Sequence, residues 1–158
     1  MSGRPPLPRP ATAADVELLC GLMAANYAEA NYPSEPRAAR EAFAALVRDP
    51  ALGRAWIVEV DDRAAGYAVL TLGWSLEYGG RDAFVDDLYV APEYRGRGLG
   101  GAALAAVEAA ARELGVRALH LEVERGNRPA QELYRRRGFR DNDRQILTRR
   151  LDARAQPR

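Results

Sequence analysis

The stretch LYVAPEYRGRGLGG, which runs from Leu88 to Gly101, decides how the rest of the chain is interpreted. Behind an apolar, strand-like start it holds four glycines within six positions. Glycines let backbone N–H groups approach an anion closely, and a helix that starts after the loop adds the positive end of its dipole. The stretch therefore predicts a diphosphate site. Its spacing fits both Gly96-x-Gly98-x-x-Gly101, as in dinucleotide-binding loops, and Arg95-x-x-Gly98-x-Gly100, which suits the diphosphate of coenzyme A.

Length and composition indicate one soluble domain. The 158 residues are 47% apolar, enough to bury a sizeable core, and we predict a single domain over residues 1–158 with a disordered tail at 152–158. The 23 basic and 22 acidic residues nearly cancel, so no overall field favours a nucleic-acid or membrane partner. No leader-like or membrane-length apolar run is present, and a cytoplasmic location is expected.

The residue types exclude two classes of catalysis. All 23 basic residues are arginines, so the chain has neither a lysine for a Schiff base nor the lysine of a Walker A phosphate loop. Cys20 is the single cysteine, which excludes an intramolecular disulfide and a thiolate metal cluster. No metal site is expected. His120 is the single histidine of the chain and is interpreted as a packed or surface residue rather than a base.

Hydrophobic periodicity predicts a mixed α/β fold. Two helices are expected first, over residues 12–30 and 37–49, after a short edge strand at 7–10. Three antiparallel strands follow, at 55–60, 66–78 and 81–90. Beyond the glycine loop come a helix at 98–114, a strand at 118–124, a helix at 128–139 and a last strand at 144–151. The loop thus comes late in the chain, behind an antiparallel meander.

That order decides between the two cofactors. A dinucleotide fold places its glycine loop directly after the first strand of a parallel sheet, with an acid about 20 residues further on. Glu122 and Glu124 meet the requirement for an acidic residue. The loop, however, follows antiparallel strands, and more than half of the chain precedes it. Fewer than 60 residues remain, too few for the parallel strands still required. The coenzyme A interpretation is therefore favoured.

Two motifs carry a resemblance to a known family. DDLYVAPEYRGRGLG at 86–100 and NRPAQELYRRRGF at 127–139 resemble the GCN5-related N-acetyltransferase (GNAT) family, and the likeness extends over about residues 55–139. The acidic pair Asp86-Asp87 and the Asn-x-Pro followed by Tyr134 are most similar to the spermidine/spermine (diamine) acetyltransferase branch. The resemblance implies a GNAT fold, with a mixed sheet of about six to seven strands, antiparallel at first and splayed at a β-bulge, and about four helices. It also implies acetyl-CoA as cosubstrate, no metal, and a possible homodimer.

The resemblance further implies where coenzyme A binds. Its pantetheine arm would lie as an extra strand along backbone N–H groups freed by the splay, and its diphosphate would lie on the glycine loop. The residues expected to bind it in the first motif are Leu88, Tyr89, Val90, Arg95, Gly96, Arg97, Gly98, Leu99, Gly100 and Gly101. Those expected in the second motif are Asn127, Pro129, Ala130 and Arg137, the last for the 3′-phosphate. Solvated arginines, and simple helix capping by Asn127, remain alternative interpretations.

Acetyl transfer to an amine requires proton movements at two places. An alkylamine, with a pKa of about 10.4, is protonated at neutral pH and has to lose a proton before it attacks. Asp86, at the family's acidic position, is the expected base, directly or through water; a structural carboxylate bonded to a bulge amide is the alternative. Tyr134 is the expected general acid for the departing sulfur, with packing in the core as its alternative.

The acceptor is the least defined part of the prediction. Glu77, Asp87 and Tyr27 are the expected substrate-binding residues, since an acid-lined site suits a cationic amine. Plain strand alternation, however, turns Asp87 to the face opposite Asp86, where a structural role is the alternative. We expect the primary amine of a small molecule, such as a polyamine or an amino acid. A protein N-terminus or lysine as acceptor, and a coenzyme A-binding module without catalysis, remain open.

Overall fold

The structure, a computed structural model, describes residues 5–152. The chain divides into two compact units, Met1–Glu124 and Arg125–Arg158, and each is described by itself. The tail predicted at 152–158 lies outside the described residues, apart from Asp152. The single-domain organisation stays a prediction.

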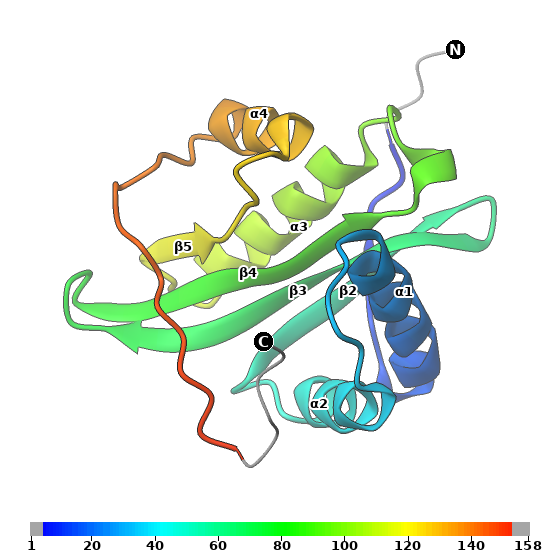
Figure 1. Cartoon of the computed structure of the whole chain (residues 1–158), viewed down its shortest axis with the longest axis horizontal. Helices are drawn as coiled ribbons and strands as arrows, with labels where there is room; N and C mark the ends of the chain where they lie inside the picture. Colours follow the sequence, from blue (N-terminus) through cyan, green and yellow to red (C-terminus); the bar gives the residue numbers. More distant parts are fainter. Residues whose placement is uncertain (1–4, 153–158) are drawn as a thin grey trace. The chain divides into compact units, whose positions relative to one another are not determined.

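A five-stranded mixed sheet forms the centre of the first unit (Figure 1). Its strands are β1 (Arg9–Pro10), β2 (Gly53–Val60), β3 (Arg63–Ser75), β4 (Gly80–Val90) and β5 (Ala118–Leu121), arranged in the order of the sequence. The first four pair antiparallel, and β5 is parallel to β4. The structure confirms the mixed α/β class and the predicted meander, although β1 and β5 are shorter than expected.

The predicted count of six to seven strands is too high, because the expected last strand does not form. Residues 144–151 have no regular secondary structure. Ile146 and Leu147 are adjacent, which breaks the alternation of a strand, and they are 60% and 90% exposed. A strand needs a partner and a face to bury. This segment has neither within the part of the chain that the structure describes.

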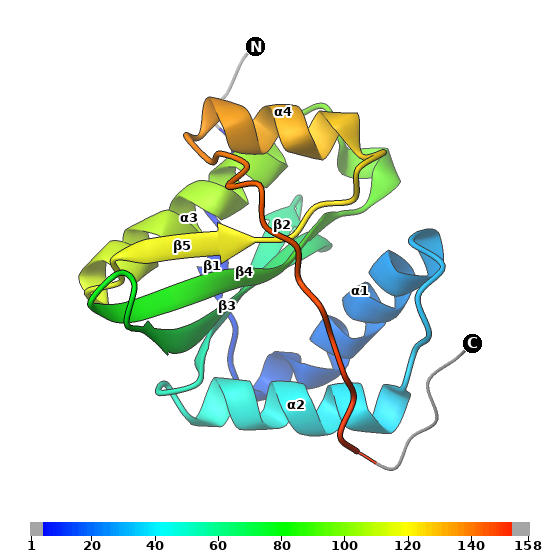
Figure 2. The ribbon, with the colours of Figure 1, turned by 60° about the vertical axis from the view of Figure 1, so that its left-hand side comes forward.

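Helices cover both faces of the sheet in the first unit. α1 (Val16–Glu29) and α2 (Pro36–Arg48) pack on one face, and α3 (Leu99–Glu113) packs on the other (Figure 2). Short 3₁₀ turns, η1 (Ala13–Asp15) and η2 (Pro92–Tyr94), precede α1 and the glycine loop. Apolar residues at three- and four-residue spacing predicted these helices and supply the two core layers that hold them.

A β-bulge in β4 shapes the region of interest. The register between β3 and β4 pairs Leu70 with Val85 and Val69 with Asp87, which leaves Asp86 as the extra residue. A bulge of this kind bends the strand and shifts its inside–outside alternation by one residue. Asp87 therefore joins Val69 on the face that α1 covers.

The sheet opens directly after this bulge. The pairing of β4 with β5 ends where Val85 lies opposite Leu121. β4 continues to Val90, still paired with β3 (Figure 1). From Asp86 onward, the β5 side of β4 has no strand partner among the described residues. This is the splay that the family resemblance implied.

Candidate functional site

The bulge places two adjacent carboxylates, Asp86 and Asp87, where the sheet opens. Asp86 is exposed, yet the protein atoms around it remove part of its hydration and raise its pKa. Burial raises the pKa of Asp87 to about 6, while a hydrogen bond from Tyr67 lowers it and the charge of Asp86 raises it further. Desolvation and a like charge both favour the protonated form of a carboxyl. The pair is therefore suited to take up a proton close to neutral pH.

A buried tyrosine holds Asp87 in place. Tyr67 on β3 is fully buried, and its hydroxyl donates a hydrogen bond to Asp87 Oδ2 at 2.9 Å. The same hydroxyl oxygen accepts a hydrogen bond from Asn26 Nδ2, on α1, at 3.2 Å. Burial, followed by the charge of Asp87, raises the pKa of Tyr67, which keeps it a neutral donor. These contacts join α1, β3 and β4 at the bulge.

Tyr27 of α1 lies beside the same two carboxylates. Burial raises the pKa of Tyr27 to about 12, and the charges of Asp87 and Asp86 add to the rise. The bulge interrupts the plain alternation from which the two acids were expected on opposite faces. The structure brings Tyr27 and Asp87, two of the three predicted substrate-binding residues, together with Asp86.

The loop between α1 and α2 reaches the β5 side of the opening. Tyr32 in this loop donates a hydrogen bond to Glu124, which follows β5. The rings of Tyr27 and Tyr32 meet edge-on, with centroids 5.8 Å apart. The aromatic and acidic groups beside the bulge therefore continue across to the segment after β5.

Glu77, the third predicted substrate-binding residue, lies elsewhere. It is in the turn between β3 and β4, before Gly80, the first residue of β4. Asp86 lies six positions after Gly80 in β4, a distance of roughly 20 Å at the usual rise of a strand. The structure does not bring Glu77 together with the acid pair.

The edge of β4 past the bulge offers main-chain groups. Leu88, Tyr89 and Val90 pair with β3 on one side only. The side chain of Tyr89 is buried in the core against α1 and α2. An open strand edge of this kind binds an extended ligand through its backbone N–H and C=O groups.

The glycine loop joins β4 to α3 through two left-handed residues. Gly96 and Gly98 both have a φ of 76°, a conformation that favours glycine. Gly98 is the N-cap of α3, so the N–H groups that follow, from Leu99 to Gly101, have no partner inside the helix. The side chain of Leu99 is buried. The donors that this loop presents to an anion are therefore main-chain groups.

The two arginines of the loop are engaged with neighbouring groups. Arg95 donates to the Val90 carbonyl at 2.8 Å and pairs with Glu29 of α1, also at 2.8 Å. Arg97 donates to the Glu93 carbonyl at 3.4 Å. Arg95 thus links the end of β4 to α1. It is not merely a solvated side chain, which was the alternative interpretation.

In the second unit, Asn127 begins α4 (Arg128–Arg136). Its Oδ1 accepts a hydrogen bond from the Ala130 backbone N–H at 3.2 Å, and Pro129 lies in the first turn. The capping role considered for Asn127 is therefore present in the structure. Arg137 is the residue that ends this helix, and its side chain is exposed.

Tyr134, also in the second unit, packs against Phe139, with ring centroids 5.9 Å apart. Burial raises the pKa of Tyr134. A phenol with a raised pKa keeps its proton at neutral pH, as a general acid must before it donates.

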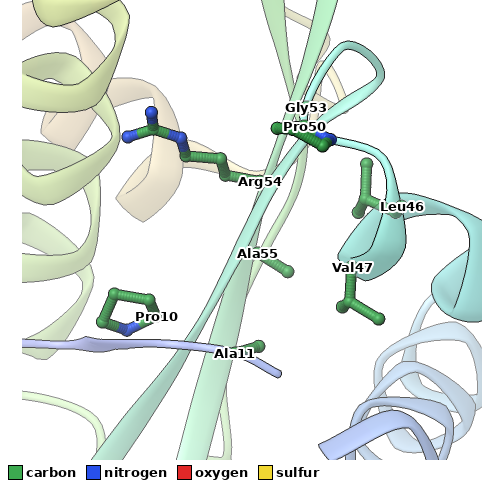
Figure 3. A pocket seen from close by; sticks show the side chains of 8 residues that line it. All are labelled: Pro10, Ala11, Leu46, Val47, Pro50, Gly53, Arg54 and Ala55. Atoms are coloured by element: carbon green, nitrogen blue, oxygen red, sulfur yellow. The ribbon is translucent and has the colours of Figure 1, made fainter. Parts of the chain in front are cut away.

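A separate hollow of about 190 Å³ lies between the start of β2 and the end of α2 (Figure 3). It is lined by Pro10, Ala11, Leu46, Val47, Pro50, Gly53, Arg54 and Ala55. None of these residues belongs to the acid pair or to the glycine loop. Within residues 5–152, no three His, Cys, Asp or Glu side chains are grouped to hold a metal, and no helix has the length and apolar character to cross a membrane.

Comparison with known proteins agrees with this geometry. The acetyltransferase (GNAT) family matches residues 21–139. The chain belongs to the GNAT family. This membership confirms the family predicted from the two motifs.

Individual GNAT relatives resemble the chain to different extents. The thialysine N-epsilon-acetyltransferase of Bos taurus is 36% identical over 76 residues, covering 48% of this chain and 44% of that protein. A protein of Bacillus subtilis (strain 168) named for alanine N-acetylation of ribosomal protein bS18 is 32% identical over 83 residues, covering 52% and 51%. The chain thus spans about half the length of these curated relatives. The crystal structure of integron cassette protein HFX_CASS3, from the mobile metagenome of Cole Harbour Salt Marsh, shares 43% identity and a TM-score of 0.84, covering 93% of this chain and 91% of that one.

Sequence reasoning missed two residues of this candidate site, Tyr67 and Asn26. Each residue stands out weakly in the sequence, as a polar group among apolar residues. Tyr67 has a hydroxyl in an otherwise apolar part of β3, and Asn26 has an amide in the mainly apolar helix α1. Neither signal names the partner, because 41 residues separate the two in the chain.

Proposed function

We propose that this chain transfers the acetyl group of acetyl-CoA to a primary amine of a small molecule by direct attack, without an acetyl-enzyme intermediate. The observation that carries the proposal is the bulge in β4. It ends the pairing with β5 and sets Asp86 and Asp87 beside the edge that it leaves open. An edge that suits an amide-containing arm and a proton acceptor for an amine are thus adjacent, as transfer in one step requires.

Named groups of this chain are available to bind each part of acetyl-CoA. Acetyl-CoA supplies an activated thioester when bound. The main-chain N–H groups of Leu88 and Val90, which point away from β3, hold its extended arm, and the Leu88 N–H stabilises charge on the acetyl oxygen. The N–H groups of loop 96–101, with Arg95 and Arg97 beside them, hold the diphosphate. From the second unit, the residues assigned to the coenzyme are Asn127, Pro129, Ala130 and Arg137.

Two side chains move protons in this proposal. Asp86, the exposed member of the pair, takes a proton from the acceptor ammonium, directly or through water. Tyr134 gives a proton to the departing sulfur, and the second proton that the nitrogen loses as the amide forms returns to Tyr134 through water. The raised pKa values of both groups suit these directions, since the carboxyl holds a proton more readily and the phenol starts protonated.

The acceptor that best fits the first unit is a small cationic amine. The carboxylates of Asp86 and Asp87 lie near Tyr27, whose ring meets that of Tyr32, and Tyr32 donates a hydrogen bond to Glu124. Carboxylates and aromatic faces both attract an ammonium group. The likeness to a thialysine N-epsilon-acetyltransferase supports an amine at the end of a flexible chain. A protein N-terminus is the second candidate, favoured by the relative named for ribosomal alanine N-acetylation.

Thiol release from acetyl-CoA across a panel of amines tests the proposal. The panel contains polyamines, amino acids, aminoglycosides, and peptides with an N-terminal alanine. We expect turnover with small amines, and a loss of about 100-fold in kcat/KM for Asp86→Asn. Turnover with peptides alone would favour the second candidate. Binding of acetyl-CoA without thiol release for any amine would indicate a coenzyme A-binding module instead.

Two further expectations belong to this proposal. A homodimer is expected from the family resemblance, and sedimentation velocity of the purified protein tests it. A cytoplasmic location is expected from composition, and fractionation of cells that express the protein tests it.

A further inference from the structure

The hydrogen bonds from Asn26 to Tyr67 and from Tyr67 to Asp87 form a chain with a fixed direction. A tyrosine hydroxyl has one hydrogen to donate, and the ionised carboxylate of Asp87 can only accept. The Tyr67 oxygen already accepts from Asn26 Nδ2, so its hydrogen is directed at Asp87 Oδ2. The rings of Phe43 and Tyr89, each with its centroid 6.2 Å away, hold the Tyr67 ring in place. The carboxyl of Asp87 is therefore oriented rather than free to rotate.

This arrangement leaves the second oxygen of Asp87 available. Oδ2 accepts from Tyr67, whereas Oδ1 takes part in no hydrogen bond within the part of the chain that the structure describes. In that part, no buried side-chain oxygen lacks a partner. Oδ1 is therefore open to solvent, on a carboxyl that is otherwise largely enclosed.

The groups that face Asp87 are hydroxyls and another acid. Asp86 precedes it on β4, Tyr67 faces it from β3, and Tyr27 faces it from α1. Arg95, beyond the end of β4, is engaged by Glu29. Among the described residues, no cation contributes to the shift of either acid. Two neighbouring carboxylates without a cation bind the first proton as a pair.

We infer that Asp87 stores the proton that the acceptor amine loses, and that Tyr67 and Asn26 are the residues that position it. The inference rests on the proposed function. An N–H bond of the ammonium breaks as an O–H bond forms on Asp86. That O–H bond then breaks, directly or through one water, as an O–H bond forms on Asp87 Oδ1. Asp86 is ionised again, and Asp87 returns the proton to water after the amide product leaves.

The pH dependence of kcat/KM tests this relay. Tyr67 stabilises the ionised form of Asp87, so Tyr67→Phe is expected to move the acidic limb of the profile upward by about one pH unit. Asn26→Leu removes only the hydrogen bond that Asn26 donates to the Tyr67 hydroxyl. This variant is expected to move the acidic limb upward by less than Tyr67→Phe does. Val107→Ala is the matched control: it opens a cavity under α3, on the other face of the sheet, and lowers the melting temperature, but leaves the limb in place.

A direct titration of Asp87 gives a readout that needs no turnover. The carbon-13 resonance of its carboxyl, in protein without substrate, is expected to titrate at a pH of about 6 in the wild type and higher in Tyr67→Phe. Titration at the ordinary value of an aspartate, or an unmoved limb in both Tyr67→Phe and Asn26→Leu, overturns the relay while amine acetylation stands. Should Tyr67→Phe fail to fold, Asn26→Leu and the wild-type titration decide the matter. Absence of thiol release with every amine in the wild type overturns the proposed function, and the relay with it.

Discussion

At neutral pH the ionised carboxylate of Asp87 lowers the free energy of unfolding of the protein. Its pKa in the folded protein is about 6, against 3.8 for an unperturbed aspartate. The folded state therefore binds this proton more tightly than the unfolded state, and stability falls as pH rises from about 4 to above 6. Asp87→Asn removes the charge, so we expect it to raise the free energy of unfolding at pH 8 by about 1 to 2 kcal/mol. The gain should vanish at pH 4, and urea unfolding at the two pH values measures it.

Asp86→Asn is the control for that prediction. Asp86 is exposed, so its removal should change stability less than the removal of Asp87 at the same pH. Equal unfolding free energies for Asp87→Asn and wild type at pH 8 would contradict a half-buried carboxylate whose ionised form destabilises the folded state. A more stable but less active Asp87→Asn would be a trade of stability for function.

Tyr134→Phe tests the proton donor at the same scale. The substitution keeps the ring that packs on Phe139 and removes only the hydroxyl. We expect kcat to fall by about 100-fold or more, with the affinity for acetyl-CoA unchanged, because the group acts on the leaving sulfur. Steady-state kinetics and calorimetric titration with acetyl-CoA measure the two quantities. An unchanged kcat with normal binding would remove Tyr134 from the mechanism.

At the scale of the elements, Gly66 of β3 lies close to the main chain of β4. A Cβ at this position would overlap the carbonyl oxygen of Tyr89, a main-chain atom that cannot rotate away. Gly66→Ala is therefore expected to push β4 outward at the edge proposed to bind the pantetheine arm. We expect a loss of about 2 to 4 kcal/mol in stability and weaker acetyl-CoA binding.

Gly21→Ala is the matched control, since Gly21 lies within α1 and nothing stands within 4 Å of an added Cβ. Alanine in a helix interior should increase stability by about 0.5 to 1 kcal/mol. Urea midpoints of both variants measure the contrast. If Gly66→Ala were as stable as the wild type, the main chain of β4 would have to lie farther from Gly66 than it does in the structure.

The elements also show how far sequence reasoning reached. Local periodicity predicted α1 to α4 and the β2–β4 meander, because spacing along the chain determines which face a helix or strand buries. It failed at 144–151, where strand-like composition had no partner to pair with. The resemblance implied a bulge, but its position at Asp86 depends on the register between two strands, which is a tertiary property. The contact of Asn26 with Tyr67 was out of reach for the same reason.

At the scale of the whole molecule, residues assigned to the coenzyme occur in each of the two units. The glycine loop at 96–101 and the β4 edge belong to the first unit, and Asn127 to Arg137 belong to the second. A ligand slows amide exchange in the segments that it contacts, because it stabilises the state to which it binds. Acetyl-CoA is therefore expected to slow hydrogen exchange at 96–101 and at 127–137 together.

Residues 36–48 of α2 are the internal control, since none of them is assigned to the coenzyme; their exchange should change only through global stabilisation. Protection confined to the glycine loop would separate α4 from the coenzyme site and leave Tyr134 without a role in transfer. NAD is the matched ligand control, because a dinucleotide would engage the same glycines through its diphosphate. Protection by NAD and none by acetyl-CoA would show that the glycine loop binds a dinucleotide, although it follows antiparallel strands. It would contradict the assignment of coenzyme A.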